Sequence, residues 1–176
     1  MNYIIAQKQN GLFLLDGQPT RFTTKDLLCK CCGEGLVDER VLRAIRDTET
    51  CLGYEVDLNG CARCEIYNKS IGGTIVSSHL FEVMKPSIAI DFEKKDKPYT
   101  EIWENAVCNF QRVGVYVSKY TDKDGNPQAY FHGDIKPKRL FWYKDARGYH
   151  YYNNPTFCIN DFTEKVMKKQ KDGDSQ

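Results

Sequence analysis

The sequence lacks any long hydrophobic run. No stretch in its 176 residues approaches the roughly 20 apolar residues that span a bilayer. The first residues, MNYIIAQKQNGLFLLDGQ, also lack the charged start and apolar segment of a signal peptide. These absences predict a protein that is synthesised in the cytoplasm and has no membrane partner.

An excess of charge of either sign is missing as well. The chain has 25 lysine and arginine residues against 24 aspartate and glutamate residues. Two short basic runs, KKDKP (94–98) and KPKR (136–139), are interpreted as solvated loops, since acidic residues lie close to the first of them. The composition therefore gives no electrostatic basis for a nucleic-acid partner.

Internal repeats and linkers rich in proline, glycine or serine are absent too, so the sequence shows no domain boundary. A chain of 176 residues is long enough to bury one core. We expect a single domain over residues 1–164 and a polar, flexible tail over residues 165–176. We also expect a monomer.

Hydrophobic periodicity indicates helices and strands without regular alternation between them. The expected helices cover residues 23–28, 37–49 and 99–110, the last with Thr100 as its cap. The expected strands are YEVDL (54–58), SIAIDF (87–92), a hairpin of RVGVYVSKY and QAYFHGDI around TDKDGNP, and a hairpin of RLFWY and YHYYN around KDARG. This mixture predicts a compact α+β fold with a central antiparallel sheet and flanking helices.

The eight cysteines are many for a chain of this length. Five of them form two groups, Cys29, Cys31 and Cys32 in CKCCGEG and Cys61 and Cys64 in CARC. The C-x-C and C-x-x-C pairs could supply four thiolates to a structural zinc ion. Buried free thiols and a redox-sensitive, disulfide-forming pair are the other interpretations, and we favour these two.

Histidine is scarce, with three residues, and two of them lie near carboxylates. His79 and Asp91 belong to SSHLFEVMKPSIAIDF, and His132 in YFHGDI shares a strand face with Asp134 because side chains alternate along a strand. Catalytic zinc commonly takes three ligands of this kind and keeps one position open. The alternative is that these are hydrogen-bonded structural histidines, as we expect for His150.

Five segments in the same order resemble peptidase family M15, the zinc peptidases that share a fold with D-Ala-D-Ala carboxypeptidases, phage endolysin peptidases and the hedgehog signalling domain. They span about residues 20–145 and read DLLCKCCGEGLVDERVLRAIRD, GCARCEIYNKSIGGTIVSSHL, AIDF, RVGVYVSKY and YFHGDIKPKRLFWY. The family's S-x-H, A-x-D and H-x-D elements fall on Ser77–His79, Ala89–Asp91 and His132–Asp134. The resemblance implies that His79, Asp91 and His132 bind zinc.

The resemblance also implies further site residues. Arg63 occupies the place of a family arginine that binds the substrate carboxylate or orients the carbonyl, a task that suits a planar guanidinium. Ser77 and Asn68 would contact the substrate beside it.

The chain departs from the family at two places. Twelve positions separate His79 from Asp91 where the family has about seven, and Ala129 stands where many members carry an acidic general base. Asp134 is then the candidate base, or a residue that orients a ligand histidine, and Glu82 is a weaker candidate base.

These residues together predict a zinc-dependent peptidase of peptidoglycan stem peptides, acting as a D,D-carboxypeptidase or endopeptidase. Such an endolysin-like protein would reach the wall through a separate pore-forming protein or as part of a virion. The alternative is a non-catalytic binding or structural, virion-associated protein on the same fold.

Overall fold

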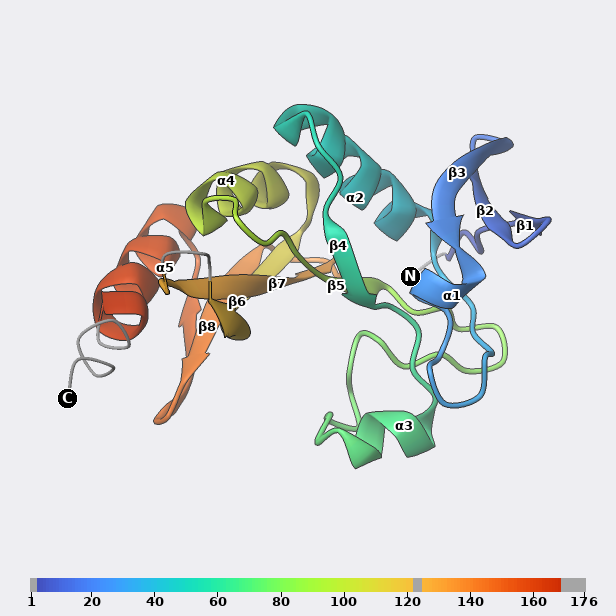
Figure 1. Ribbon diagram of the computed structural model, residues 1–176. Helices are drawn as coiled ribbons and strands as arrows, with labels where there is room; N and C mark the ends of the chain where they lie inside the picture. The colour runs from blue at the N-terminus through green and yellow to red at the C-terminus, as the bar shows by residue number, and fades with distance from the viewer. Residues whose placement is uncertain (1–2, 122–124, 169–176) are drawn as a thin grey trace.

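The structure is a computed structural model that describes residues 3–121 and 125–168, and its strands form two sheets (Figure 1). A small antiparallel sheet contains β1 (Lys8–Gln9), β2 (Leu12–Leu15) and β3 (Gln18–Thr23). The main sheet has six strands in the order β4-β5-β7-β6-β8-β9. Its strands are β4 (Asp57–Gly60), β5 (Ala89–Glu93), β6 (Arg112–Thr121), β7 (Pro127–Asp134), β8 (Leu140–Asp145) and β9 (Gly148–Tyr152).

The helices are α1 (Thr24–Leu27), α2 (Glu39–Leu52), α3 (Glu65–Ser70), α4 (Tyr99–Asn109), α5 (Pro155–Phe162) and the π-helix η1 (Thr163–Met167). Figure 1 shows α4 and α5 along one side of the main sheet and α3 beyond the opposite side. The predicted α+β class is confirmed by this arrangement of helices and strands.

The main sheet is mixed, so the expectation of a purely antiparallel sheet is wrong in one pairing. β6 and β8 run parallel, with Gly114 opposite Trp142, whereas the other adjacent strands are antiparallel. The cause is the connection after β7, which carries the chain past β6 before β8 begins. The two predicted hairpins are present as β6–β7 and β8–β9, although residues 122–124 of the first turn lie outside the described residues.

Alternation along the strands separates a core face from a polar face. Phe92 on β5, Phe131 on β7 and Phe141 on β8 are buried, and they pack with the helices that cover this face. The ring centroids of Trp103 on α4 and Phe141 lie 6.0 Å apart. Because side chains alternate, the residues between these positions must point to the opposite face.

Two helix starts show how caps set the boundaries. The side chain of Thr23 accepts a hydrogen bond from Asp26 N–H, and the Asp26 carboxylate accepts one from Thr23 N–H, a capping box that starts α1. The expected cap of α4 at Thr100 is wrong, because the helix begins after Pro98 without a side-chain cap. The fixed φ of proline suits the start of a helix, so a side-chain cap is not required there.

Several elements differ from the sequence expectations. The sheet β1–β3 and the helices α5 and η1 were not predicted, and the strand expected at 54–58 lies at Asp57–Gly60. Val166 and Met167 are buried, so residues 165–168 belong to the domain and not to a flexible tail. Residues 169–176 lie outside the described residues. Among the helices described, none combines the length and the apolar character needed to cross a membrane.

Candidate metal centre

Three of the predicted ligands meet on the polar face of the main sheet. Asp91 on β5 and His132 on β7 are directly opposite one another in the antiparallel register. His79 reaches them from the loop between α3 and β5, where its backbone N–H donates to Ser77 Oγ at 3.3 Å. We call His79, Asp91 and His132 the histidine cluster.

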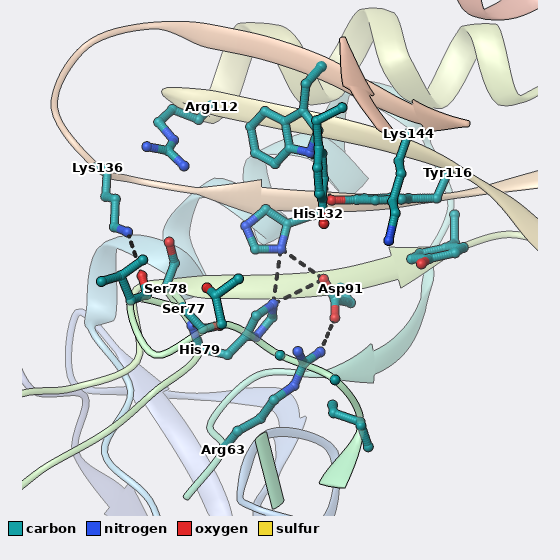
Figure 2. A pocket seen from close by; sticks show the side chains of 18 of the residues that line it. Arg63, Ser77, Ser78, His79, Asp91, Arg112, Tyr116, His132, Lys136 and Lys144 are labelled. Atoms are coloured by element: carbon teal, nitrogen blue, oxygen red, sulfur yellow. Dashed lines mark hydrogen bonds and ion pairs between the residues drawn. The ribbon is translucent and has the colours of Figure 1, made fainter. Parts of the chain in front are cut away.

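The ligand atoms of the histidine cluster converge closely. His79 Nε2 lies 2.9 Å from His132 Nδ1 and 3.1 Å from Asp91 Oδ1, and His132 Nδ1 lies 3.0 Å from the same oxygen. Figure 2 shows the two rings and the carboxylate turned toward one point. The five additional residues between His79 and Asp91, relative to the family spacing, do not prevent this meeting.

The partners of the two rings determine which nitrogens carry protons. His79 Nδ1 lies 2.7 Å from the carbonyl oxygen of Cys61, which can only accept, so Nδ1 is protonated and Nε2 keeps its lone pair. His132 Nε2 faces Asp134 Oδ2 at 3.3 Å, which leaves Nδ1 for the cluster. When His132 is neutral with its proton on Nε2, three electron-rich atoms face one another, and they could hold a metal ion. Imidazole and carboxylate together suit zinc, whereas magnesium and calcium prefer oxygen ligands.

The electrostatics of the metal-free cluster support this interpretation. Burial lowers the pKa of His79, which keeps that ring neutral. Burial alone would also lower the pKa of His132, but hydrogen bonds to Asp134 and Asp91 outweigh burial and raise its pKa to about 9. Burial opposes ionisation of Asp91, yet His79 and His132 hold its pKa well below the ordinary value. A proton on His132 thus supplies the positive charge when no metal does.

Arg63 supports the cluster from the side. Its guanidinium pairs with Asp91 Oδ2, the oxygen that faces away from the two rings. Arg63 also lines the adjoining cavity. Its direct partner in the structure is the carboxylate of Asp91, so it positions that side chain as well.

Asp134 is placed differently from the prediction of a general base. It is fully buried, and it accepts hydrogen bonds from Ser78 Oγ at 3.1 Å and Lys136 N–H at 3.0 Å. Arg112 Nε lies 3.1 Å from Oδ1, an ion pair that lacks hydrogen-bond alignment. Asp134 does not line the cavity. Its contact with His132 Nε2 at 3.3 Å fits the alternative interpretation, a residue that orients a ligand histidine.

A cavity of about 620 Å³ opens over the histidine cluster. Its walls carry the cationic side chains Arg63, Arg112, Lys136 and Lys144 and the aromatic side chains Tyr116, Tyr130, Trp142, Tyr149 and Tyr151. Figure 2 shows Arg112, Lys136 and Lys144 around the cluster. Such a cavity favours a ligand that carries negative charge.

Much of this site lies along one line of paired residues that crosses the main sheet from strand to strand. Asp91, His132, Gly114, Trp142 and Tyr151 stand opposite one another on consecutive strands β5, β7, β6, β8 and β9. Gly114 has no side chain, so the indole of Trp142 covers it beside His132. Arg112, the lysines and the aromatic residues of the cavity were not predicted from the sequence. For those on the strands, such as Arg112 and Tyr116, the period-two spacing was a usable signal.

The other predicted site residues lie in different positions relative to the cavity. Ser77 lines the cavity. Asn68 is buried and donates to the Thr74 carbonyl oxygen at 2.8 Å, so it shapes the loop before His79 and does not line the cavity. Glu82 is exposed and pairs with Lys85 at 2.8 Å, and Ala129 is buried. Among the described residues, Asp91 is the only carboxylate that lines the cavity.

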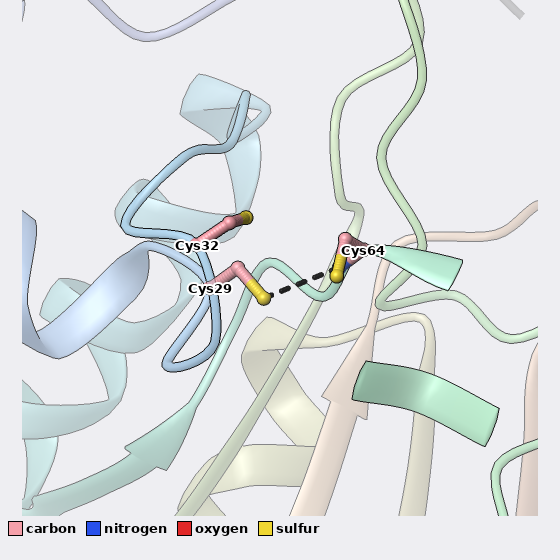
Figure 3. A group of neighbouring side chains, drawn as sticks. All are labelled: Cys29, Cys32 and Cys64. Carbon is pink, nitrogen blue, oxygen red and sulfur yellow. Dashed lines mark hydrogen bonds between the residues drawn. The ribbon is translucent and has the colours of Figure 1, made fainter. Parts of the chain in front are cut away.

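A second group of potential ligands lies outside the cavity. The sulfur atoms of Cys29, Cys32 and Cys64, which we call the cysteine cluster, all lie within 4.8 Å of one another (Figure 3). Cys61 is not part of it, because its buried Sγ faces Ser87 Oγ at 3.7 Å. Cys31 is exposed next to the cysteine cluster.

Comparison with known proteins adds no assignment. No protein-family model matches the chain, and no curated protein matches it. The similarity to peptidase family M15 therefore stays a prediction from the motifs.

Proposed function

We propose that this protein is a zinc-dependent peptidase that acts on peptidoglycan stem peptides. The observation that carries the proposal is the convergence of His79 Nε2, His132 Nδ1 and Asp91 Oδ1 within 2.9–3.1 Å beneath a cationic cavity. Two imidazoles and one carboxylate form a ligand set found in zinc hydrolases. The motif resemblance to peptidase family M15 supports the same reaction class.

The chain's own residues would hold the zinc ion and the substrate in separate ways. When bound, zinc supplies Lewis acidity, which lowers the pKa of water and polarises a carbonyl group. Cys61 O and Asp134 fix the two rings so that their free nitrogens stay aimed at one point. Arg63 holds Asp91 through the carboxylate oxygen that the rings do not use.

The cavity supports an anionic peptide as substrate. Lys136, Lys144 and Arg112 line it, and their positive charges attract carboxylates such as the terminal carboxylate of a stem peptide. Tyr116 and Tyr130 stack with ring centroids 4.9 Å apart and offer an apolar wall with hydroxyl groups. This combination suits a short peptide with a charged end.

A second function, non-catalytic peptide binding, is favoured by one observation. The described part of the cavity contains no carboxylate besides Asp91 that could act as a general base. Burial raises the pKa of Tyr130 to about 12, so this hydroxyl stays protonated near neutral pH and donates hydrogen bonds. A protein that binds stem peptides without cleaving them would need no base.

One experiment separates the two functions. The purified protein is analysed for zinc and incubated with peptidoglycan, and released amines are measured with and without a chelator. The peptidase proposal expects zinc in the wild type and amine release that both the chelator and His132→Ala abolish. His150→Ala is the matched control. His150 lies on β9, its Nε2 is 3.0 Å from Asp145 Oδ1, and it does not line the cavity.

Two results would contradict the peptidase proposal. One is a wild-type protein whose zinc content does not change in His132→Ala. The other is a zinc-loaded protein that sediments with peptidoglycan but releases no amine, which would establish the binding function instead.

A further inference from the structure

The cysteine cluster is built by a tight turn and a distant segment. Cys29 and Cys32 belong to the sequence CKCCG, where Gly33 N–H donates to Cys29 O at 2.8 Å and Gly33 adopts φ 71°. This left-handed conformation favours glycine, and the hydrogen bond closes a turn that contains both cysteines. Cys64 arrives from the start of α3 (Figure 3).

The ligand spacing is therefore C-x-x-C, with Cys64 as a third residue. The sequence had suggested C-x-C with C-x-x-C, but Cys61 faces Ser87 and takes no part. Two cysteines separated by two residues on a tight turn are a recurrent arrangement of structural zinc sites.

Backbone N–H groups point at the sulfur atoms of this cluster. Cys64 N–H donates to Cys29 Sγ at 3.4 Å, and Tyr67 N–H donates to Cys64 Sγ at 3.4 Å. Donors of this kind stabilise a thiolate, the form of cysteine that binds metals.

We propose that Cys29, Cys32 and Cys64 bind a structural zinc ion, with the neighbouring thiol of Cys31 as the fourth ligand. Structural zinc sites are almost always four-coordinate and closed by thiolates or imidazoles. Three converging sulfurs argue against a disulfide, which would join two of them and leave the third as an unpaired thiol. Soft thiolate ligands select zinc over magnesium or calcium.

The site would fasten the loop after α1 to the segment that supports the histidine cluster. That segment, residues 61–64, already pairs with its neighbours through Ala62 N–H to Leu27 O at 2.9 Å and Arg63 N–H to His79 O at 2.8 Å. Cys61 O accepts the His79 hydrogen bond, Arg63 holds Asp91, and Cys64 ends the segment in the cysteine cluster. A zinc ion on Cys64 would therefore fix the position of groups that orient the other cluster.

Zinc content of the full-length protein tests the proposal. Protein purified under reducing conditions is analysed for zinc and iron, and the wild type should hold one zinc ion at each of the two clusters. Cys32→Ser should lose one of them, His132→Ala should lose the other, and Cys108→Ser should lose neither. Cys108 is the matched control because its exposed thiol, on α4, donates to Glu104 O at 3.3 Å and lies outside the cysteine cluster.

A spectroscopic measurement detects the thiolate ligands directly, so the test does not depend on zinc loss from variants that fold poorly. In His132→Ala protein reconstituted with cobalt, the thiolate ligands should give a thiolate-to-cobalt charge-transfer band, and Cys32→Ser introduced in that background should remove it. Cys31→Ser should keep the zinc stoichiometry but release zinc faster to a chromogenic chelator, since it removes one of four ligands.

The outcomes distinguish the two clusters. Zinc that is lost in Cys32→Ser but unchanged in His132→Ala supports this site and contradicts the proposed peptidase. Zinc content unchanged in Cys32→Ser, iron in place of zinc, or a mass showing a disulfide within the cysteine cluster under reducing purification would each overturn the proposal.

Discussion

The histidine cluster and the cysteine cluster position their ligands by different means. Two of the three histidine-cluster residues stand on paired strands, and buried side chains such as Asp134 orient them. The cysteine cluster lies on a turn and at the start of a short helix, and main-chain N–H groups face its sulfurs. The first opens to a cavity and the second does not line it. Catalytic zinc sites keep an open position and structural zinc sites are closed by their ligands, so the two clusters fit the two proposed roles.

The two clusters also differ in what can replace a metal ion. In the histidine cluster, the pKa of His132 is raised to about 9, after burial has been outweighed by Asp134 and Asp91, so a proton can supply the positive charge. The cysteine cluster, by contrast, consists of three thiols. We therefore expect the metal-free protein to keep the histidine cluster and to loosen the cysteine cluster.

The largest expected effect comes from removing one ligand of each cluster in turn. Cys64→Ser should lower the free energy of unfolding by several kcal/mol, since structural zinc sites bind with apparent free energies of about 10–16 kcal/mol. His132→Ala should instead reduce amine release to the level of the chelated wild type, because it removes a ligand of the proposed catalytic zinc ion. Thermal denaturation and the peptidoglycan assay, run on both variants, measure the two effects. If Cys64→Ser abolishes activity at an unchanged melting temperature, the cysteine cluster does not have the purely structural role expected here.

The next expected effect is a pH dependence of the metal-free protein. The folded pKa of His132, about 9, lies above the ordinary histidine pKa of 6.5, so its contribution to stability is fully present below about pH 6.5 and is lost as the pH rises through about 9. The loss can reach about 3 kcal/mol, since one pKa unit corresponds to about 1.4 kcal/mol.

Denaturation of the chelated protein between pH 6 and pH 10 measures this loss, with His132→Gln as the reference that lacks the titrating ring. An NMR titration reports the same group directly. A His132 ring that titrates near its ordinary pKa would contradict the prediction.

The contrast between the clusters also explains what the sequence could and could not predict. His79, Asp91 and His132 could be selected because few histidines are present and strand alternation places His132 on a polar face. The burial of Asp134 could not be seen, because Ser78 and Lys136 cover it from segments distant from β7 or beyond its end. Its position against His132 and outside the cavity was therefore not predictable from the sequence.

The fold shows the same limit. Amphipathic helices α2 and α4 and the two hairpins were readable from local periodicity, whereas the parallel pairing of β6 with β8 depends on a chain crossing that no local pattern records. The four cationic residues of the cavity come from separate segments, so their meeting is a property of the tertiary structure. The pairing of Cys29 with Cys64 is of the same kind.

A smaller effect is expected from Asp134→Asn. The amide keeps the shape of the side chain but removes the carboxylate that faces His132 Nε2 at 3.3 Å. Loss of such an outer partner typically weakens metal binding or activity by about 10–100-fold. Competition with a chelator measures zinc affinity, and Asp161→Asn is the matched control, since Asp161 accepts hydrogen bonds from Tyr143 and Tyr152 away from the cavity. If Asp134 were the general base, activity would fall without any change in zinc affinity.

The smallest effect tests whether the histidine cluster, unlike the cysteine cluster, depends on packing across the sheet. A Cβ on Gly114 would lie 2.4 Å from the Trp142 ring, and the indole that donates to Tyr116 Oη at 2.8 Å would have to move. Overpacking costs about 1–3 kcal/mol of stability. Alanine offsets about 0.4–1 kcal/mol of this cost, because it lowers the conformational entropy of the unfolded chain. Gly114→Ala should therefore destabilise the protein by about 1–2 kcal/mol. It should also raise KM, because Trp142 lines the cavity, while the zinc of the cysteine cluster is retained.

Gly60→Ala is the control, as its Cβ would meet only Arg63 Nη2 at 4.0 Å. Equal stability and KM in both variants would show that the Trp142 wall does not shape the site.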